Sequence, residues 1–292
     1  MTYTADLHTH STASDGQYTP AQLADMAKKE GLAVWALTDH DTLDGLEEAV
    51  QAGESQGLRV LRGIELSAKE YHTFHILGLC VDPAAPALAG LCQDMRVGRD
   101  ERGLRMVAYL KEKGVEISLE EVKELAGGNI VGRPHFAQVL TRHGFVSSNR
   151  EAFDRYLDTE EFHQRVERPK PAAQTCVETI RAAGGKASLA HPYQIGVENE
   201  ELERIVRELA DCGLEAIECF YPRHSPEQTA AYLRLADKYG LHITGGSDFH
   251  GEAVRPDTFL TPTPLNLNWL GTFQNAQPHR NRLDQSQIPH FR

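Results

Sequence analysis

The chain has 292 residues, of which 40% are hydrophobic and 25% are charged, and its formal net charge is −12. This length suits one large α/β domain or a barrel with an insertion, and the acidic balance argues against a basic surface for long nucleic acids. Its apolar runs are too short to cross a bilayer, and its N-terminus lacks the features of a signal peptide, so we expect a cytoplasmic protein that does not associate with membranes.

Strand and helix patterns alternate over residues 1–82. The first helix begins at Thr19-Pro20, where proline takes the first helical position, and it ends at Gly31. A second helix is predicted over 43–55. Strands are predicted over 3–7, 33–37, 59–66 and 74–81. This alternation is typical of a parallel sheet.

Helical periodicity then replaces the alternation over residues 83–171. Charged residues are dense in this segment, and it contains no convincing strand pattern. The helices are predicted over 88–113, 119–126, 134–143 and 151–156. We interpret residues 83–171 as a helical insertion that forms a cap over the site.

The alternation resumes at residue 172. Helices are predicted over 174–183, 199–212 and 226–239, and strands over 186–189, 216–220 and 242–245. With about seven strands, residues 1–82 and 172–258 together predict a TIM-like barrel that lacks one unit. Residues 259–292 are rich in Pro, Asn, Gln and Thr, and we expect this tail to pack on the barrel.

Histidine and acidic residues accompany most of these predicted strands. His8 and His10 are two residues apart, so their side chains point to the same side of an extended segment. Glu65 lies in an apolar strand pattern, where a carboxylate needs a cationic partner or a metal ion. The candidate ligands are His8, His10, Asp15, His40, Glu65, His75, His191, Asp248 and His250. Such nitrogen and oxygen ligands without cysteine suit Mn²⁺, Fe²⁺ or Zn²⁺.

Nine candidate ligands exceed what one or two ions need. A carboxylate such as Glu65 can bridge two ions, so we expect three divalent ions. Their charge would outweigh that of the three carboxylates, which favours an anionic phosphate as the substrate. Bound ions of this kind also lower the pKa of water and so supply a nucleophile.

The order of these motifs from Asp6 to His250 resembles that of the polymerase and histidinol phosphatase (PHP) family of metal-dependent phosphoesterases. The resemblance implies a distorted (β/α)7 barrel with three divalent ions, for which we expect Mn²⁺, with Fe²⁺ or Zn²⁺ as alternatives. It implies that one ion is held by His8, His10, Glu65 and Asp248, a second by Glu65, His75 and His191, and a third by Asp15, His40 and His250.

Two further segments, Gly132-Arg133-Pro134-His135 and Tyr221-Pro222-Arg223-His224-Ser225, resemble a narrower subgroup, the 3′,5′-nucleoside bisphosphate phosphatases. Some members of that subgroup also trim short RNA from the 5′ end. The resemblance implies removal of the 3′-phosphate from a small nucleotide such as adenosine 3′,5′-bisphosphate. It implies that Arg133, His135 and His224 bind the substrate and take part in catalysis, with Arg133 and His224 on phosphate and a histidine assisting the leaving oxygen.

Other functions fit parts of the same pattern. The same ligands would serve a histidinol phosphate phosphatase or a 5′–3′ exoribonuclease on short oligonucleotides. A carbon-centred amidohydrolase is less favoured, because such enzymes often bridge two ions with a carboxylated lysine and no lysine ends a middle strand here. A non-catalytic metal-binding module is disfavoured by the complete set of ligands. The sequence indicates no obligate protein partner.

Overall fold

The computed structural model describes residues 2–127 and 130–271. Eight strands in this part of the chain form one sheet in the order β7-β6-β5-β4-β3-β2-β1-β8. The strands are β1 (Thr2–Asp6), β2 (Val34–Leu37), β3 (Arg59–Ser67), β4 (His75–Leu79), β5 (Lys186–Leu189), β6 (Ala216–Phe220), β7 (His242–Gly245) and β8 (Thr263–Asn266).

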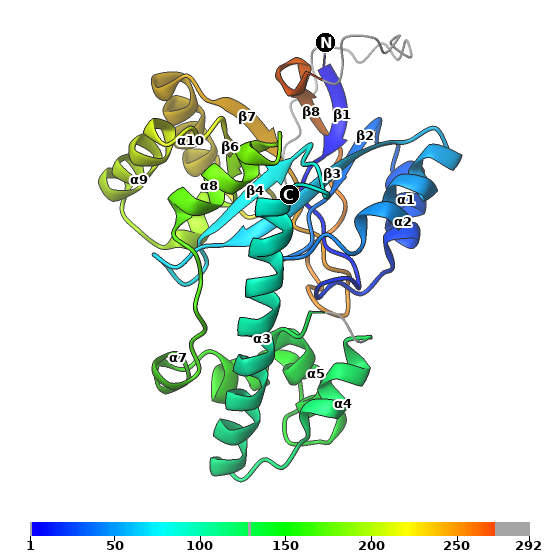
Figure 1. The fold of residues 1–292 in the computed structure, drawn as a ribbon, viewed down its shortest axis with the longest axis vertical. Helices are drawn as coiled ribbons and strands as arrows, with labels where there is room; N and C mark the ends of the chain where they lie inside the picture. The colour runs from blue at the N-terminus through cyan, green and yellow to red at the C-terminus, as the bar shows by residue number, and fades with distance from the viewer. Residues whose placement is uncertain (1, 128–129, 272–292) are drawn as a thin grey trace.

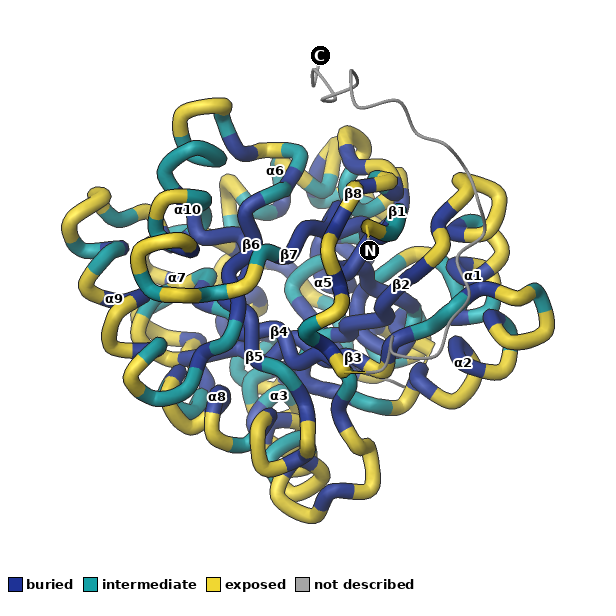
Figure 2. The backbone as a smooth tube through the Cα atoms, turned by 90° about the horizontal axis from the view of Figure 1, so that it is seen from above, coloured by how far each residue is buried: buried dark blue, intermediate teal, exposed yellow. Residues whose placement is uncertain are grey.

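The sheet curls into a nearly closed barrel, as the sequence predicted. The Leu7 N–H donates to the Gly245 carbonyl at 3.1 Å, and the Asp248 N–H donates to the His8 carbonyl at 2.8 Å. These bonds join the end of β1 to the end of β7. Helices lie around the strands (Figure 1), and the strands run through the most buried part of the molecule (Figure 2).

Two strands differ from the parallel sheet that the alternation suggested. β4 is antiparallel to both β3 and β5. The reason is the short connection over 68–74, because a parallel crossover needs a dozen residues or more. β8 was not predicted and is antiparallel to β1. It lies in the tail expected to pack on the barrel, of which residues 272–292 lie outside the described residues.

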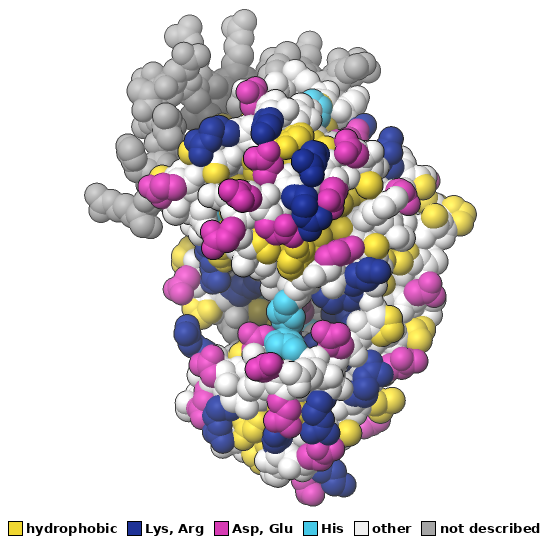
Figure 3. All heavy atoms as spheres, turned by 90° about the vertical axis from the view of Figure 1, so that its left-hand side faces the viewer, with side chains coloured by type: hydrophobic (Ala, Val, Ile, Leu, Met, Phe, Trp, Pro, Cys, Tyr) yellow, Lys and Arg dark blue, Asp and Glu magenta, His cyan; other side chains and the backbone are white. Residues whose placement is uncertain are grey.

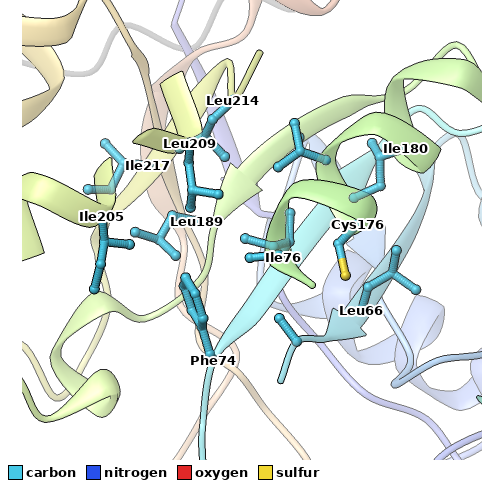
Figure 4. Close-up of a cluster of buried hydrophobic side chains, with 14 of the residues drawn as sticks. Leu66, Phe74, Ile76, Cys176, Ile180, Leu189, Ile205, Leu209, Leu214 and Ile217 are labelled. Carbon is cyan, nitrogen blue, oxygen red and sulfur yellow. The ribbon is translucent and has the colours of Figure 1, made fainter. Parts of the chain in front are cut away.

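The helices around the barrel lie close to the predicted ranges. They are α1 (Pro20–Lys29), α2 (Leu46–Ser55), α8 (Ala173–Ala182), α9 (Asn199–Asp211) and α10 (Pro226–Tyr239), with short turns η2 (Pro192–Ile195) and η3 (Asn268–Leu270). The main core lies between strands and helices (Figure 4). There Leu66 and Ile76 of the sheet and Ile180 of α8 are fully buried, each with no exposed surface. Apolar burial of this kind fixes the strands that carry the site.

Residues between β4 and α8 form only helices in the described part of the chain. They are α3 (Pro86–Glu112), α4 (Leu119–Leu125), α5 (Arg133–Arg142), α6 (Asn149–Ala152), η1 (Phe153–Leu157) and α7 (Glu160–Arg165). We call α3 to α7 the cap. Its helices share a second core that includes Tyr109, Phe136 and Phe162, and Figure 1 shows them as a group at one end of the barrel.

The long helix α3 connects the barrel to the cap. Its 27 residues span about 40 Å at the helical rise of 1.5 Å per residue. Leu88 and Met95 at its start pack in the barrel core, whereas Met106 and Leu110 near its end pack in the cap core. None of the described helices, α3 included, is long and apolar enough to span a membrane. The cytoplasmic location stays a prediction.

Candidate active site

His8 and His10 lie directly after β1, where the chain leaves the barrel. Both side chains are fully buried, and they point to the same side because the residues alternate. The residue between them, Thr9, points to the sheet instead. Its hydroxyl donates to the Ala36 carbonyl at 2.9 Å and accepts from the Trp35 indole at 2.8 Å. Thr9 therefore holds the two imidazoles in place from behind.

Glu65 of β3 lies at the centre of the predicted ligands. Its carboxylate is fully buried, and both oxygens face imidazoles. Oε1 lies 3.2 Å from His8 Nε2, and Oε2 lies 3.2 Å from His10 Nε2. Asp248 completes this group with Oδ1 at 3.6 Å from His8 Nε2 and 3.3 Å from His10 Nε2. These four side chains can offer one ligand atom each to a common ion.

The direction of β4 places His75 at the same edge of the barrel. His75 is the first residue of β4 and pairs with Ser67 at the end of β3. Because β4 runs antiparallel, its start lies beside the carboxyl end of its neighbour. His75 Nδ1 and His191 Nε2 each lie 2.9 Å from Glu65 Oε1 and 3.3 Å from one another. The ring of His40 faces the other oxygen, Oε2, at 2.8 Å.

A third group forms between the loop after β1 and the loop after β7. His250 Nε2 lies 3.3 Å from Asp15 Oδ1. His10 and His40 also reach this group, and the four side chains can share an ion. The structure therefore brings together all nine of the residues that the sequence analysis proposed as metal ligands. Their assignment to individual ions stays a prediction.

The chemistry of these side chains fits divalent ions. Several buried polar atoms that face the group have no hydrogen-bond partner among the described residues, including Nε2 of His8, His10 and His250, Oε2 of Glu65 and Oδ1 of Asp248. Such atoms are costly to bury unless something else binds them. Metal ions would satisfy them, because neutral imidazole nitrogens and carboxylate oxygens are metal ligands.

The histidines of this group differ in pKa, because nearby carboxylates raise the pKa of some and burial lowers the pKa of others. Burial lowers the pKa of His10, but the nearby carboxylates of Asp248 and Glu65 outweigh it and raise the pKa to about 9. In His75, burial prevails and lowers the pKa to about 3, so this imidazole is already neutral at pH 7. Ions that bind here must displace protons from some histidines, so we expect metal binding to release protons.

Two of the candidate ligands have an unusual backbone. His191 has φ of 24° and Asp248 has φ of 55°, a region that residues other than glycine rarely adopt. Each lies at the point where a strand ends and the chain turns over the barrel. This strain is typical of functional sites, where the surrounding structure fixes the side chain in one direction.

Glu218 of β6 was missed by the sequence analysis. It is fully buried, and its Oε1 lies 3.2 Å from His8 Nδ1. Its Oε2 accepts a hydrogen bond from the His191 N–H at 2.7 Å. Glu218 therefore directs Nε2 of His8 toward Glu65 and Asp248. The only signal in the sequence was a glutamate inside an apolar strand pattern, as for Glu65.

We expect Glu218→Gln to weaken metal binding by about 10- to 100-fold, because partners of this kind orient a ligand and raise its basicity. Competition with a chelator would measure the affinity. Glu215→Gln is a matched control, since Glu215 pairs with Lys186 just before β6 and should leave the affinity unchanged. Equal affinities for the two variants would contradict this role.

Asp39 and Asp41 flank His40, but the hydrogen bonds of their carboxylates go to other groups than its imidazole. Asp39 accepts hydrogen bonds from the Ser11 N–H at 2.7 Å and the Ser14 hydroxyl at 2.6 Å. Asp41 instead accepts hydrogen bonds at Oδ2 from Nε of Arg99 in α3, at 3.0 Å, and from Nη2 of Arg168, at 2.7 Å. Asp41 thereby ties the start of the cap and its return linker to the barrel.

A cavity of about 920 Å³ opens beside the ligands, between barrel loops and cap. Asp15, His40 and His75 form part of its wall. Its other walls carry a set of cations that we call the basic set: Lys69, Arg99, Arg102, Arg133, Arg168, Lys170, Arg223 and Arg255. Figure 3 shows a hollow on this face with lysine and arginine side chains inside it and histidines at its edge.

The basic set is crowded and incompletely neutralised. Burial and the charge of neighbouring arginines lower the pKa of Lys170 to about 8, of Arg102 to about 9 and of Arg168 to about 10. Nη1 of Arg168 is buried without a hydrogen-bond partner in the described residues. Cations held this close together form a site that favours an anion. Of this set, the sequence analysis proposed only Arg133 as a residue that binds phosphate.

Arg133, His135 and His224 have different surroundings. Arg133 begins α5 and reaches the cavity, where its Nη1 lies 2.6 Å from Asp158 Oδ1. His135 and His224 are buried and are not among the residues that line the cavity in the described structure. His135 caps α5, with Nδ1 accepting from the Gly132 N–H at 3.0 Å. His224 Nδ1 lies 3.1 Å from the Cys219 carbonyl.

Comparisons with known proteins agree with this geometry. Residues 6–159 match the PHP domain model. Over 86% of its length, the chain is 36% identical to a 3′,5′-nucleoside bisphosphate phosphatase of Chromobacterium violaceum, of which the match covers 89%. Over the same share of its length, it is 34% identical to a 5′–3′ exoribonuclease of Haemophilus influenzae, of which the match covers 91%. It is also 36% identical, over 86% of its length, to a phosphoribosyl 1,2-cyclic phosphate 1,2-diphosphodiesterase of Eggerthella lenta, of which the match covers 95%. A putative metal-dependent phosphoesterase of Bifidobacterium adolescentis has a similar structure, with a TM-score of 0.81 and 29% identity over 90% of this chain and 93% of that one.

The barrel and its clustered ligands thus define a metal-dependent phosphoesterase. This chain belongs to the PHP domain family, which confirms the resemblance inferred from the motifs. Its activity is therefore hydrolysis of phosphoesters. The relatives carry names for several phosphoester substrates, so family membership alone leaves the substrate open.

Proposed function

We propose that this protein removes the 3′-phosphate of nucleoside 3′,5′-bisphosphates, such as adenosine 3′,5′-bisphosphate. One observation carries the proposal: a single cavity joins the candidate metal ligands to the basic set. Such a cavity has room for two phosphate groups, one over the ions and one among the arginines. The relative of Chromobacterium violaceum, 36% identical, is named for this activity.

We propose that three divalent ions, with Mn²⁺ as the first candidate, bind the nine ligands. When bound, they would activate water as the nucleophile and neutralise charge on the phosphoryl oxygens. Arg255 lines the cavity and forms an ion pair with Asp248, so its guanidinium lies at the metal end of the cavity. Arg133 lies in the cap and would hold phosphate from the opposite wall.

The hydrogen bonds of the two histidines suggest separate roles. His135 accepts at Nδ1, so its neutral ring carries the proton on Nε2 and can donate it to a phosphate or leaving oxygen. His224 faces a carbonyl with Nδ1, so its neutral ring carries the proton there and Nε2 is an acceptor. Burial lowers the pKa of both rings. Neither ring lines the cavity in the described structure, but the position of the proton favours His135 over His224 as a donor to phosphate.

A second candidate function is 5′–3′ exoribonuclease activity on short oligonucleotides. The relative of Haemophilus influenzae, 34% identical, carries that name. The basic set would then hold the 5′-phosphate of an RNA end. The net charge of −12 disfavours long nucleic acids, because they need an extended basic surface. We propose a small nucleotide as the main substrate, in a cytoplasmic protein without an obligate protein partner.

Comparison of substrates under identical conditions tests the proposal. Protein loaded with Mn²⁺ is given adenosine 3′,5′-bisphosphate, a short 5′-phosphorylated RNA, a phosphoribosyl 1,2-cyclic phosphate or histidinol phosphate, and product release is measured. We expect the highest kcat/KM for the bisphosphate, with adenosine 5′-monophosphate as product. A higher kcat/KM for any other substrate would contradict the proposal, and no turnover of any would favour a metal-binding module.

We expect the affinity for substrate to depend on pH through Lys170, which lines the cavity. Its pKa is lowered to about 8, mainly by burial and by the charge of Arg168, so the side chain is charged below that pH and neutral above it. We therefore expect KM for the bisphosphate to rise about tenfold from pH 7 to pH 9, since a hydrogen bond to a charged group contributes roughly 1.5–3 kcal/mol. Lys170→Arg keeps its charge over this range and should flatten the rise in KM. A KM that rises equally in the variant would exclude Lys170 as the cause.

A further inference from the structure

We propose that His72, Asp158 and His163 form a further binding site for a divalent transition-metal ion, separate from the nine ligands and located where the cap meets the barrel. His72 belongs to the loop that joins β3 to β4, whereas Asp158 and His163 belong to the end of the cap. The site would therefore connect two parts of the chain that are far apart in sequence.

The three side chains converge on one point. His163 Nε2 lies 3.0 Å from Asp158 Oδ1, and His72 Nε2 lies 3.5 Å from the same oxygen. The two imidazole rings are 4.1 Å apart between centroids, at an interplanar angle of 66°. One ligand atom from each residue can lie within 4.8 Å of the others. An ion between them would have two nitrogens and one oxygen as protein ligands.

The same arrangement occurs among the nine ligands. There, imidazole nitrogens lie between 2.8 Å, for His40 and Glu65, and 3.6 Å, for His8 and Asp248, from carboxylate oxygens. His72 and His163 lie within the same range of Asp158.

The exposure of the three side chains and the nearby charges determine how tightly this site would bind an ion. The side chains of His72, Asp158 and His163 are 45%, 49% and 26% exposed, so water can complete the coordination of an ion. Two imidazoles and a carboxylate suit Zn²⁺ or Co²⁺ rather than Mg²⁺. Arg133 also donates to Asp158 Oδ1, and its charge opposes a second cation. Both imidazoles face this same oxygen, so binding of an ion here requires Arg133 to move to the other oxygen of the carboxylate. We therefore expect binding weaker than at the buried ligands.

Metal stoichiometry tests the site directly. Wild-type protein, the double variant H72Q/H163Q and the control H143Q are dialysed to equilibrium against Zn²⁺, and zinc per chain is measured by elemental analysis. His143 is a half-exposed cap histidine that pairs with Glu121. We expect wild type and H143Q to bind one more ion per chain than H72Q/H163Q. Equal stoichiometry in all three would overturn the proposal.

A second variant separates loss of the site from a general defect. D158N removes the carboxylate and should lose the same single ion, while circular dichroism and the content of more tightly bound ions stay as in wild type. Titration with Co²⁺ gives an independent readout, because the absorption band of cobalt at this site should be missing in D158N and in H72Q/H163Q. An undiminished band in both would also overturn the proposal. Neither readout depends on the substrate, so the proposed function is tested separately.

Discussion

Glu65→Gln should lower kcat/KM for every phosphoester substrate by about 1,000-fold or more, and the purified variant should contain fewer divalent ions. Glu65 faces five imidazoles within 3.2 Å, and glutamine has no negative charge and one acceptor oxygen in place of two. The loss corresponds to about 4 kcal/mol of stabilisation of the transition state, the scale of metal-ion catalysis. Elemental analysis and steady-state kinetics would measure the two effects.

A matched control distinguishes this effect from a general change of charge at the cavity. Glu167 also lines the cavity but is exposed, on the linker after the cap, so Glu167→Gln should keep both the ions and most of the activity. Circular dichroism should be unchanged in both variants. If Glu65→Gln kept the full ion content and wild-type turnover, the metal centre would have to lie elsewhere.

Arg133→Met should raise KM for adenosine 3′,5′-bisphosphate by about 10- to 100-fold, because a charged hydrogen bond contributes roughly 1.5–3 kcal/mol. Arg133 lies in the cavity wall opposite the barrel, and methionine keeps much of the length of the side chain without its charge. A chromogenic ester with a single phosphate has no second group for Arg133 to bind. We therefore expect less than about a threefold change in KM for that ester.

The test depends on comparing the change in KM for the bisphosphate with the change in KM for the single-phosphate ester. Arg150→Met is the control, since Arg150 is 90% exposed on the cap and pairs with Asp154. That variant should behave as wild type with both esters. An equal loss with the bisphosphate and the single-phosphate ester in Arg133→Met would place Arg133 at the reacting phosphate. No loss with either would exclude Arg133 from substrate binding.

Most helices and strands could be predicted because local patterns determine them. α10 begins at Ser225-Pro226, where the Ser225 hydroxyl accepts from the Gln228 N–H, and it ends at Gly240 with a positive φ. These are capping preferences that the sequence contains. β8 was missed because Thr263–Asn266 is short and contains Pro264, which is unfavourable in a central strand. Its pairing with β1 at the edge of the sheet depends on the rest of the barrel.

The sequence by itself determined the types, number and order of the candidate ligands, because each lies in a short motif beside a strand. Only the tertiary structure decided which side chains meet. β4 had to be antiparallel for His75 to face Glu65, and Glu218 lies 210 residues from His8, which it orients. The basic set likewise comes from separate segments of barrel and cap. Local periodicity contains no information on such contacts, which arise when distant segments pack around one core.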